Sequence, residues 1–285
     1  MSRVVYVNGE YLAEEDAKVS VFDRGFLFAD GVYEVTTVID GKLIDFNSHT
    51  LRLKRSLNEI EMKPACSDEE LLHIHKKLIK ENDLDEGFIY LQITRGVADR
   101  DFAYPDDNVP STLLVFTKKQ GIVNQPLVER GAKIITVEDL RWGRRDIKTV
   151  QLLFSSMAKM QAKAQGADDA WLVNEGQINE GTSSNAYIVT QDNVIVTRHL
   201  SNKILHGITR VAILKCAKAL NLKVEERPFT IEEAQNAKEA FNSASTLCIC
   251  PVIEVDGKTI GDGKIGSVTK QVRETYLREA RKSAV

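Results

Sequence analysis

The 285-residue sequence predicts an α+β protein with two domains. Short segments that alternate apolar and polar residues flank Asn-Gly and Asp-Gly turns, which is typical of antiparallel hairpins. Other segments repeat apolar residues every three or four positions, which indicates amphipathic helices. A polar stretch that ends in a glycine, residues 118–121, separates two strand regions and predicts a domain hinge. We therefore expect a smaller domain over residues 1–118 and a larger one over residues 119–285.

The smaller domain is expected to begin with strands and to continue with helices. Residues 4–12 and 34–46 are predicted to form hairpins around turns whose two central residues need positive φ. A helix follows from about Ser48, and Ser67 with Glu70 predicts a capping box at the start of the next helix. Two further strands are expected over residues 88–94 and 112–117.

The larger domain is expected to mix strands and helices. Strands are predicted over residues 133–136, 170–173 and 186–189, with a late hairpin around residues 254–257. Helices are predicted over residues 149–165 and 267–281, with two more that begin near residues 207 and 230. The turn between the second and third of these strands is expected to hold Glu180.

Composition excludes several classes of function. The net charge is −3, which predicts neither a nucleic-acid surface nor a membrane surface. The first residues resemble a strand rather than a signal peptide, and no apolar run approaches the roughly 20 residues of a membrane span. We therefore expect a cytoplasmic protein. Cys248 and Cys250 lack the spacer of zinc or redox pairs, so we interpret them as core residues and predict no metal site.

Lys148 and Glu180 carry most of the chemical information. Lys148 lies at a predicted junction into an apolar helix, and Glu180 lies beside a glycine and three hydroxyl residues. A lysine can form a Schiff base with an aldehyde cofactor, and a buried carboxylate can keep a pyridine nitrogen protonated. These are the protein groups that pyridoxal 5′-phosphate (PLP) chemistry needs most. Taken singly, a solvated lysine and an ordinary polar loop remain alternatives.

Three other places could bind a phosphate group. Gly207 to Arg210 opens a helix, where exposed N–H groups and the helix dipole attract anions. Arg52 could bind a phosphate with two hydrogen bonds. The turn from Ser243 to Thr246 is small and rich in hydroxyl groups. Each feature alone is also typical of ordinary helix starts, surface arginines and turns.

Together, five segments resemble the signatures of class IV, or fold type IV, PLP-dependent aminotransferases. They follow the order and spacing of that family along nearly the whole chain. The segments are residues 24–34 (RGFLFADGVYE), 49–53 (HTLRL), 146–148 (DIK), 179–185 (NEGTSSN) and 207–210 (GITR).

The resemblance implies a role for each matching residue. Lys148 corresponds to the Schiff-base lysine that also moves the substrate proton, and Glu180 to the partner of the pyridine nitrogen. The phosphate contacts correspond to Arg52, Ile208, Thr209, Ala244 and Ser245. The family fold also implies a homodimer whose subunits each bind PLP between two domains, with the larger C-terminal domain as the principal PLP-binding part.

Within the family, residues 31–35 most resemble those of D-amino-acid aminotransferases. Those enzymes hold the substrate carboxylate with a tyrosine, an arginine and a histidine, the last two from the neighbouring subunit. Tyr33 and Arg100 match the first two positions, but Phe102 stands where the family has histidine. Phe102 cannot donate a hydrogen bond, so the pocket is expected to be more apolar at this position.

The expected reaction is PLP-dependent transfer of an amino group from a D-amino acid such as D-alanine to a 2-oxo acid such as 2-oxoglutarate. Three alternatives come from the same family: an (R)-selective amine transaminase, a branched-chain aminotransferase and a 4-amino-4-deoxychorismate lyase. A PLP carrier or inactive scaffold is a fourth, and Lys148 and Glu180 argue against it.

Overall fold

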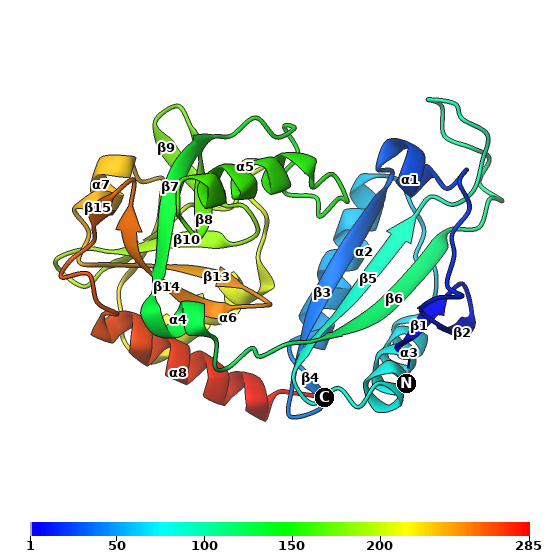
Figure 1. The fold of residues 1–285 in the computed structure, drawn as a ribbon, viewed down its shortest axis with the longest axis horizontal. Coiled ribbons are helices and arrows are strands. Elements are labelled where there is room, and N and C mark those ends of the chain that lie inside the picture. Colours follow the sequence, from blue (N-terminus) through cyan, green and yellow to red (C-terminus); the bar gives the residue numbers. More distant parts are fainter. Residues whose placement is uncertain (1) are drawn as a thin grey trace. The chain divides into compact units, whose positions relative to one another are not determined.

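The computed structural model describes residues 2–285 and divides into two compact units. The first unit comprises residues 1–122, 147–151 and 283–285, and the second comprises residues 123–146 and 152–282 (Figure 1). Each unit has its own sheet. The expected mixture of helices and strands is confirmed. The expected boundary at residue 118 assigns Lys148 to the second domain, whereas the structure packs its segment with the first unit.

Within residues 2–122, the first unit contains a six-stranded antiparallel sheet with the order β2-β1-β6-β5-β3-β4. Its strands are β1 (Val4–Val7), β2 (Glu10–Ala13), β3 (Gly31–Ile39), β4 (Lys42–Leu43), β5 (Gly87–Thr94) and β6 (Thr112–Lys119). The two predicted hairpin turns are present. Asn8 and Gly9 have φ of 47° and 102°, and Asp40 and Gly41 have 53° and 68°, as turns of this kind require.

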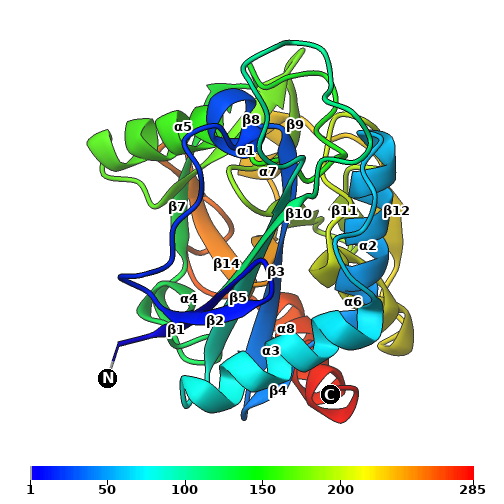
Figure 2. The ribbon, with the colours of Figure 1, turned by 90° about the vertical axis from the view of Figure 1, so that its right-hand side faces the viewer.

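Two helices supply the core of this unit, α2 (Phe46–Glu59) and α3 (Asp68–Glu81), which lie against its strands (Figure 2). A short helix, α1 (Arg24–Phe28), precedes β3. Ser67 caps α3 through one half of the predicted capping box, since its side chain accepts a hydrogen bond from the Glu70 N–H. The buried apolar side chains of these helices and of β3, β5 and β6 form one cluster, which includes Leu53, Leu57, Leu71, Ile74, Leu78, Val32, Ile89, Leu91 and Val115.

Residues 147–151 join the first unit along β3. Thr149 forms an antiparallel bridge with Val32. The Tyr33 N–H donates to the Lys148 carbonyl at 3.0 Å, and the Val150 N–H donates to the Gly31 carbonyl at 3.1 Å. This short segment is therefore held by the backbone of β3, although the chain on either side of it belongs to the second unit.

Residues 123–282 contain a nine-stranded mixed sheet with the order β12-β11-β10-β13-β14-β7-β8-β9, to which β15 is added beside β14. Its strands are β7 (Ala132–Glu138), β8 (Asp169–Asn174), β9 (Gln177–Gly181), β10 (Asn185–Val189), β11 (Ile195–Thr197), β12 (Val224–Glu226), β13 (Glu239–Ala244), β14 (Cys248–Val255) and β15 (Lys258–Thr259). The end strand β9 also contacts β10, which shows that the sheet curls back on itself. Glu180 lies inside β9 rather than in a turn, so that expectation was wrong.

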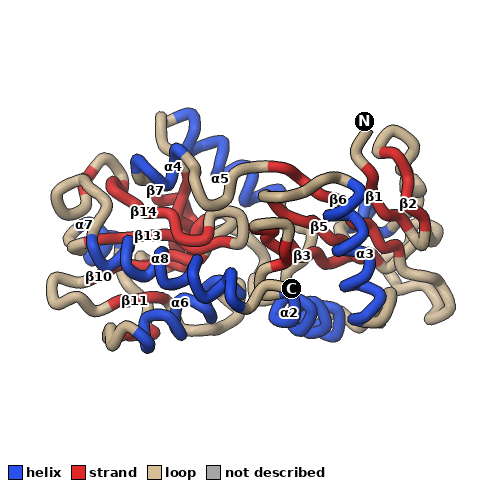
Figure 3. The backbone as a smooth tube through the Cα atoms, turned by 90° about the horizontal axis from the view of Figure 1, so that it is seen from below, coloured by secondary structure: helices blue, strands red, loops and turns tan. Residues whose placement is uncertain are grey.

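Helices cover this sheet. They are α4 (Pro126–Arg130), α5 (Leu153–Ala164), α6 (Ile208–Ala219), α7 (Ile231–Gln235) and α8 (Ser267–Lys282). Helix α5 packs on β7 and β8, whereas α6 and α8 lie side by side and contact β13 (Figure 3). Helix α5 begins at Leu153, four residues later than expected, because the residues before it pair with β3. The Thr230–Glu233 capping box is complete.

Two other expectations concern the second unit and the membrane. Cys248 and Cys250 are buried on β14, and Cys250 belongs to the core cluster of this sheet. Burial raises the pKa of Cys250 to about 12, which leaves the thiol protonated at neutral pH.

Among residues 2–285, no helix combines the length and the apolar character that crossing a bilayer needs.

The start of α8 generates a stability prediction. Glu239 of β13 is buried and accepts hydrogen bonds from the Val268 and Thr269 N–H groups at 3.0 and 2.8 Å and from the Thr269 hydroxyl at 2.8 Å. We expect Glu239→Gln to lower the free energy of unfolding by about 1.5–3 kcal/mol, because a charged acceptor is lost. Urea unfolding measures this. Glu279→Gln, which removes an exposed ion-pair partner, is the control and should leave the free energy of unfolding nearly unchanged. Equal losses would contradict the capping role.

Candidate active site

Lys148 is held by its backbone, and its amine lies over the ring of Tyr33. In addition to the bonds to β3, the Lys148 N–H donates to the Ser56 hydroxyl of α2 at 3.3 Å. The side chain is half-buried, and Nζ lies 4.0 Å from the centroid of the Tyr33 ring. Hydrogen bonds to β3 and α2 therefore hold the main chain of Lys148, and helix α5 begins only at Leu153.

Tyr33 belongs to a row of aromatic rings across three strands. The ring centroids of Tyr33 and Tyr90 are 5.5 Å apart, and those of Tyr90 and Phe116 are 4.9 Å apart, both nearly parallel. Arg3 closes the far end of the row, 5.3 Å from the centroid of Phe116. Burial, together with Tyr33, raises the pKa of the Tyr90 phenol, so it stays neutral. The row fixes the Tyr33 ring beside Lys148.

Arg52 is buried and paired with Glu34. Its Nε and Nη2 atoms donate to the two carboxylate oxygens of Glu34 at 2.8 and 2.7 Å. His49 Nδ1 lies 2.7 Å from the same carboxylate. Burial opposes ionisation of Glu34, but Arg52 and His49 lower its pKa to about 2. The carboxylate is ionised at neutral pH and holds the guanidinium of Arg52 in one orientation.

Arg100 and Phe102 lie on an exposed loop of the first unit. The guanidinium of Arg100 is 5.3 Å from the Phe28 ring centroid and 5.6 Å from that of Phe102, which is 80% exposed. Buried Arg24 anchors this loop through the carbonyls of Asp101 and Ala103, at 2.7 and 3.2 Å. Within residues 2–122, neither Arg100 nor Phe102 forms a hydrogen bond, ion pair or ring contact with Tyr33.

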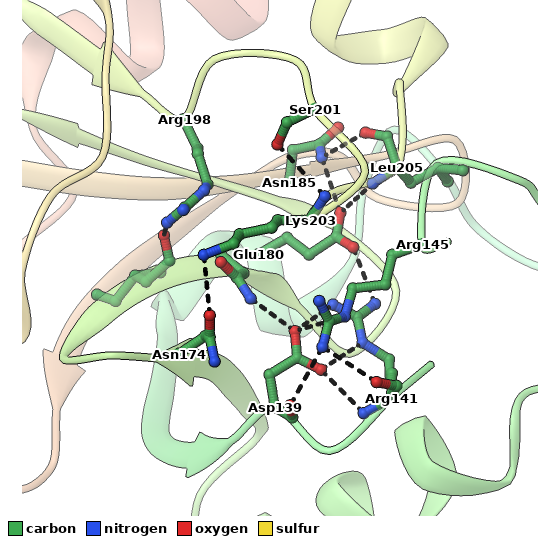
Figure 4. Close-up of polar contacts among 12 residues, drawn as sticks. Asp139, Arg141, Arg145, Asn174, Glu180, Asn185, Arg198, Ser201, Lys203 and Leu205 are labelled. Atoms are coloured by element: carbon green, nitrogen blue, oxygen red, sulfur yellow. Dashed lines mark hydrogen bonds and ion pairs between the residues drawn. The ribbon is translucent and has the colours of Figure 1, made fainter. Parts of the chain in front are cut away.

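Glu180 is buried in the second unit, and both of its oxygens accept hydrogen bonds (Figure 4). Oε1 accepts from Arg141 Nη1 at 2.8 Å. Oε2 accepts from Asn185 Nδ2 and from the Leu205 N–H, both at 3.0 Å. Burial raises the pKa of Glu180, whereas Arg141 and the Leu205 N–H oppose that rise.

Asp139, Arg141 and Asn185 are site residues that the sequence reasoning did not assign. Asp139 and Arg141 follow strand β7 with one residue between them, which is a local sign of a polar cluster at a strand end. Arg141 contacts Glu180, which is 39 residues away in the sequence, and no local pattern predicts the contact between these two residues. Asn185 lies inside the segment that resembles a family signature, but its link to Glu180 needed the fold.

The predicted phosphate-binding elements of the second unit lie around Asn185. Helix α6 begins at Ile208, and its N-cap residue, Gly207, has no side chain with which to cap the first N–H groups. A Cβ atom on Gly207 would lie 2.1 Å from Asn185 Oδ1, so only glycine fits there. Asn185 pairs with Ser243 across β10 and β13, directly before Ala244 and Ser245. The start of α6, the turn at Ala244 and Ser245, and Asn185, which donates to Glu180, thus lie at one end of the β10–β13 pair.

Comparison with known proteins assigns the family. The family model described as Amino-transferase class IV matches residues 31–255. The D-alanine aminotransferase of Staphylococcus aureus (strain N315) is 40% identical over 272 residues, covering 95% of this chain and 96% of that protein. The D-alanine aminotransferase of Listeria monocytogenes serotype 1/2a (strain 10403S) is 38% identical over 276 residues, covering 96% and 95%.

Solved structures agree with these relatives on the fold. The T.th. branched-chain amino acid aminotransferase, complexed with N-(5′-phosphopyridoxyl)-L-glutamate, superposes with a TM-score of 0.88 at 26% identity, covering 99% of this chain and 95% of that one. The branched-chain enzyme of Escherichia coli gives 0.86 at 25% identity, covering 98% and 95%. The expected fold type IV is confirmed, and the chain belongs to the class IV aminotransferase family.

Proposed function

We propose that this chain transfers the amino group of a D-amino acid, such as D-alanine, to a 2-oxo acid, such as 2-oxoglutarate, with PLP as its cofactor. The observation that carries the substrate class is the 38–40% identity, over nearly the full length, to proteins named D-alanine aminotransferase. The two branched-chain aminotransferase structures described above are 25% and 26% identical. The two groups share the fold, and the sequence favours the D-amino acid.

The residues of each unit fit PLP. When bound, PLP supplies an aldehyde carbon and a ring that accepts electrons. The uncapped start of α6, at Ile208 and Thr209, suits a phosphate group. Arg52, Ala244 and Ser245 are the further phosphate contacts that we propose. Glu180, which is buried and held by three donors, suits a protonated ring nitrogen.

Lys148 and Glu180 have distinct roles in the proposal. Lys148 would attach the cofactor covalently until the substrate amine displaces it. Its freed amine would then take the proton from the substrate α-carbon as a base and return it to the cofactor carbon as an acid. The backbone bonds to β3 keep the main chain of Lys148 in place while its side chain moves. Glu180 holds a proton on the ring nitrogen of the cofactor, which favours loss of the α-proton of the substrate.

Recognition of the substrate carboxylate is assigned to Tyr33 and Arg100, with Phe102 in the place of the family histidine. The loop of Arg100 and Phe102 is exposed in the single chain and makes none of the contacts described above with Tyr33. We propose a homodimer in which this loop serves the neighbouring subunit. An exposed apolar stripe on α5 supports association, since Leu153, Met157 and Met160 are 76%, 58% and 61% exposed. Location in the cytoplasm stays a prediction.

A second candidate function is transamination of (R)-amines that lack a carboxylate. Phe102 favours it, because an apolar side chain does not penalise a missing anion. Arg100 favours amino acids over such amines, because in the proposed dimer its guanidinium would be buried against the neighbouring subunit, and a buried guanidinium without a partner is costly. We therefore expect amino acids to be the better substrates.

Purified protein with PLP, D-alanine and 2-oxoglutarate tests the proposal. Chiral analysis should find D-glutamate and pyruvate in equal amounts, and L-alanine should give far less product. Faster reaction with L-leucine would favour a branched-chain enzyme. Release of pyruvate from 4-amino-4-deoxychorismate without an amino acceptor would favour the lyase, and failure with every donor would contradict an aminotransferase.

Lys148→Ala should abolish covalent attachment of PLP while reversible binding persists, because the phosphate contacts remain. Borohydride reduction followed by peptide mapping measures this. Lys163→Ala removes an exposed lysine of α5 and is the control, which should be labelled like the unmodified chain. Label on a lysine other than Lys148 in the unmodified chain would refute the assignment.

Arg100→Ala should lower kcat/KM for D-alanine by about ten- to a hundred-fold, as the loss of a charged hydrogen bond predicts. The value for (R)-1-phenylethylamine should change little, since that substrate has no carboxylate. Lys63→Ala, which removes a largely exposed cation near the same loop, should affect neither substrate. Equal losses on both substrates would mean that Arg100 is structural.

A further inference from the structure

Glu180 is one end of a chain of three charged side chains in the second unit (Figure 4). Arg141 donates to Glu180 through Nη1 at 2.8 Å. The same guanidinium donates to Asp139 through Nε at 2.9 Å and through Nη2 at 2.8 Å. Arg141 thus binds one carboxylate with two hydrogen bonds and directs its remaining edge toward the other.

Asp139 is built to hold Arg141 in this orientation. Its side chain is fully buried, and its backbone N–H donates to the Val173 carbonyl at 2.7 Å. Asn179 Nδ2 donates to its carboxylate at 2.7 Å, and Arg145 forms a second ion pair with it at 3.2 Å. A planar guanidinium bound by two parallel hydrogen bonds loses little further freedom when it binds a third acceptor.

Arg141 is also the cation that opposes protonation of Glu180. The charges that act on Glu180 are Arg141 and Asp139, which have opposite effects, and its remaining partners are the neutral donors Asn185 and Leu205 N–H. Burial raises the pKa of Glu180, with Arg141 the leading opposing influence. Without Arg141, two carboxylates would share a buried site without the cation between them, and proton uptake by Glu180 would relieve that cost.

We propose that Arg141 is a positioning residue of the transamination reaction, which keeps Glu180 ionised and correctly oriented, and that Asp139 in turn fixes Arg141. This inference rests on the proposed function, in which Glu180 holds a proton on the ring nitrogen of PLP. A neutral Glu180 would itself carry a proton toward that nitrogen. It would then lack the negative charge that stabilises the protonated ring.

The test compares Arg141→Met, Arg141→Lys, Asp139→Asn and Glu180→Gln with the unmodified chain. The rate of the half-reaction with D-alanine is followed by the absorbance of bound PLP across pH, and PLP affinity is measured by titration. Arg130→Met is the control, because it breaks a two-hydrogen-bond arginine–aspartate pair of the same unit that does not touch Glu180. Circular dichroism checks that each variant is folded.

Arg141→Met should lower the rate at pH 7 by about ten- to a hundred-fold, like Glu180→Gln. The acid limb of its pH profile, which is the fall in rate toward low pH, should move to higher pH because the pKa of Glu180 rises. The difference in rate from the unmodified chain should therefore shrink as the pH increases. Arg141→Lys restores the charge and should return the acid limb toward that of the unmodified chain. Asp139→Asn should reduce the rate less and should not raise the acid limb, since Arg141 keeps its charge.

The outcomes separate this inference from the proposed function. An effect of Glu180→Gln without any shift of the acid limb in Arg141→Met would overturn the role of Arg141 alone. No effect of Glu180→Gln, or no half-reaction in the unmodified chain, would overturn the proposed function itself. If Arg141→Met fails to fold, the rates of Arg141→Lys and Asp139→Asn decide. Both variants lose hydrogen bonds that orient Arg141, so the proposal predicts a lower rate in each, and rates equal to those of Arg130→Met and the unmodified chain in both would contradict it.

Discussion

A buried carboxylate needs a cation or several hydrogen-bond donors, and each unit meets this need with arginine. Glu34 is paired with Arg52 in the first unit, and Glu180 with Arg141 in the second. Removing one partner of such a buried pair typically costs about 3–5 kcal/mol, so these pairs constrain the fold as well as the site. Because the guanidinium is planar, each pair also fixes the direction of its side chains. The candidate residues are therefore oriented without a ligand.

Strand β3 carries much of the first unit's share of the site. Neighbouring strand residues face opposite sides of a sheet. Tyr33 stacks on Tyr90 and lies beside Lys148, while Glu34 faces α2 and holds Arg52. The same strand binds the backbone of the Lys148 segment. One strand thus positions the proposed attachment lysine, a substrate contact and a phosphate contact.

Local patterns in the sequence predicted the hairpin turns, the cap of α3, the start of α7 and the approximate course of the longer helices, because these features depend on neighbouring residues. Local patterns gave wrong predictions where pairing with residues far away in the sequence determines the structure. Glu180 was expected in a turn, but pairing with β8 places it in a strand. Lys148 was expected with the larger domain, but pairing with β3 places its segment in the first unit. The contact of Arg141 with Glu180 spans 39 residues and left no local signal.

The central claim is that Glu180, held ionised by Arg141, keeps the ring nitrogen of PLP protonated. Nitrogen-15 NMR of the protein reconstituted with PLP labelled at the ring nitrogen tests this most directly. We expect the chemical shift of a protonated pyridinium at neutral pH, with the proton retained as the pH is raised moderately. The shift of an unprotonated pyridine in the folded, PLP-loaded protein would contradict the account.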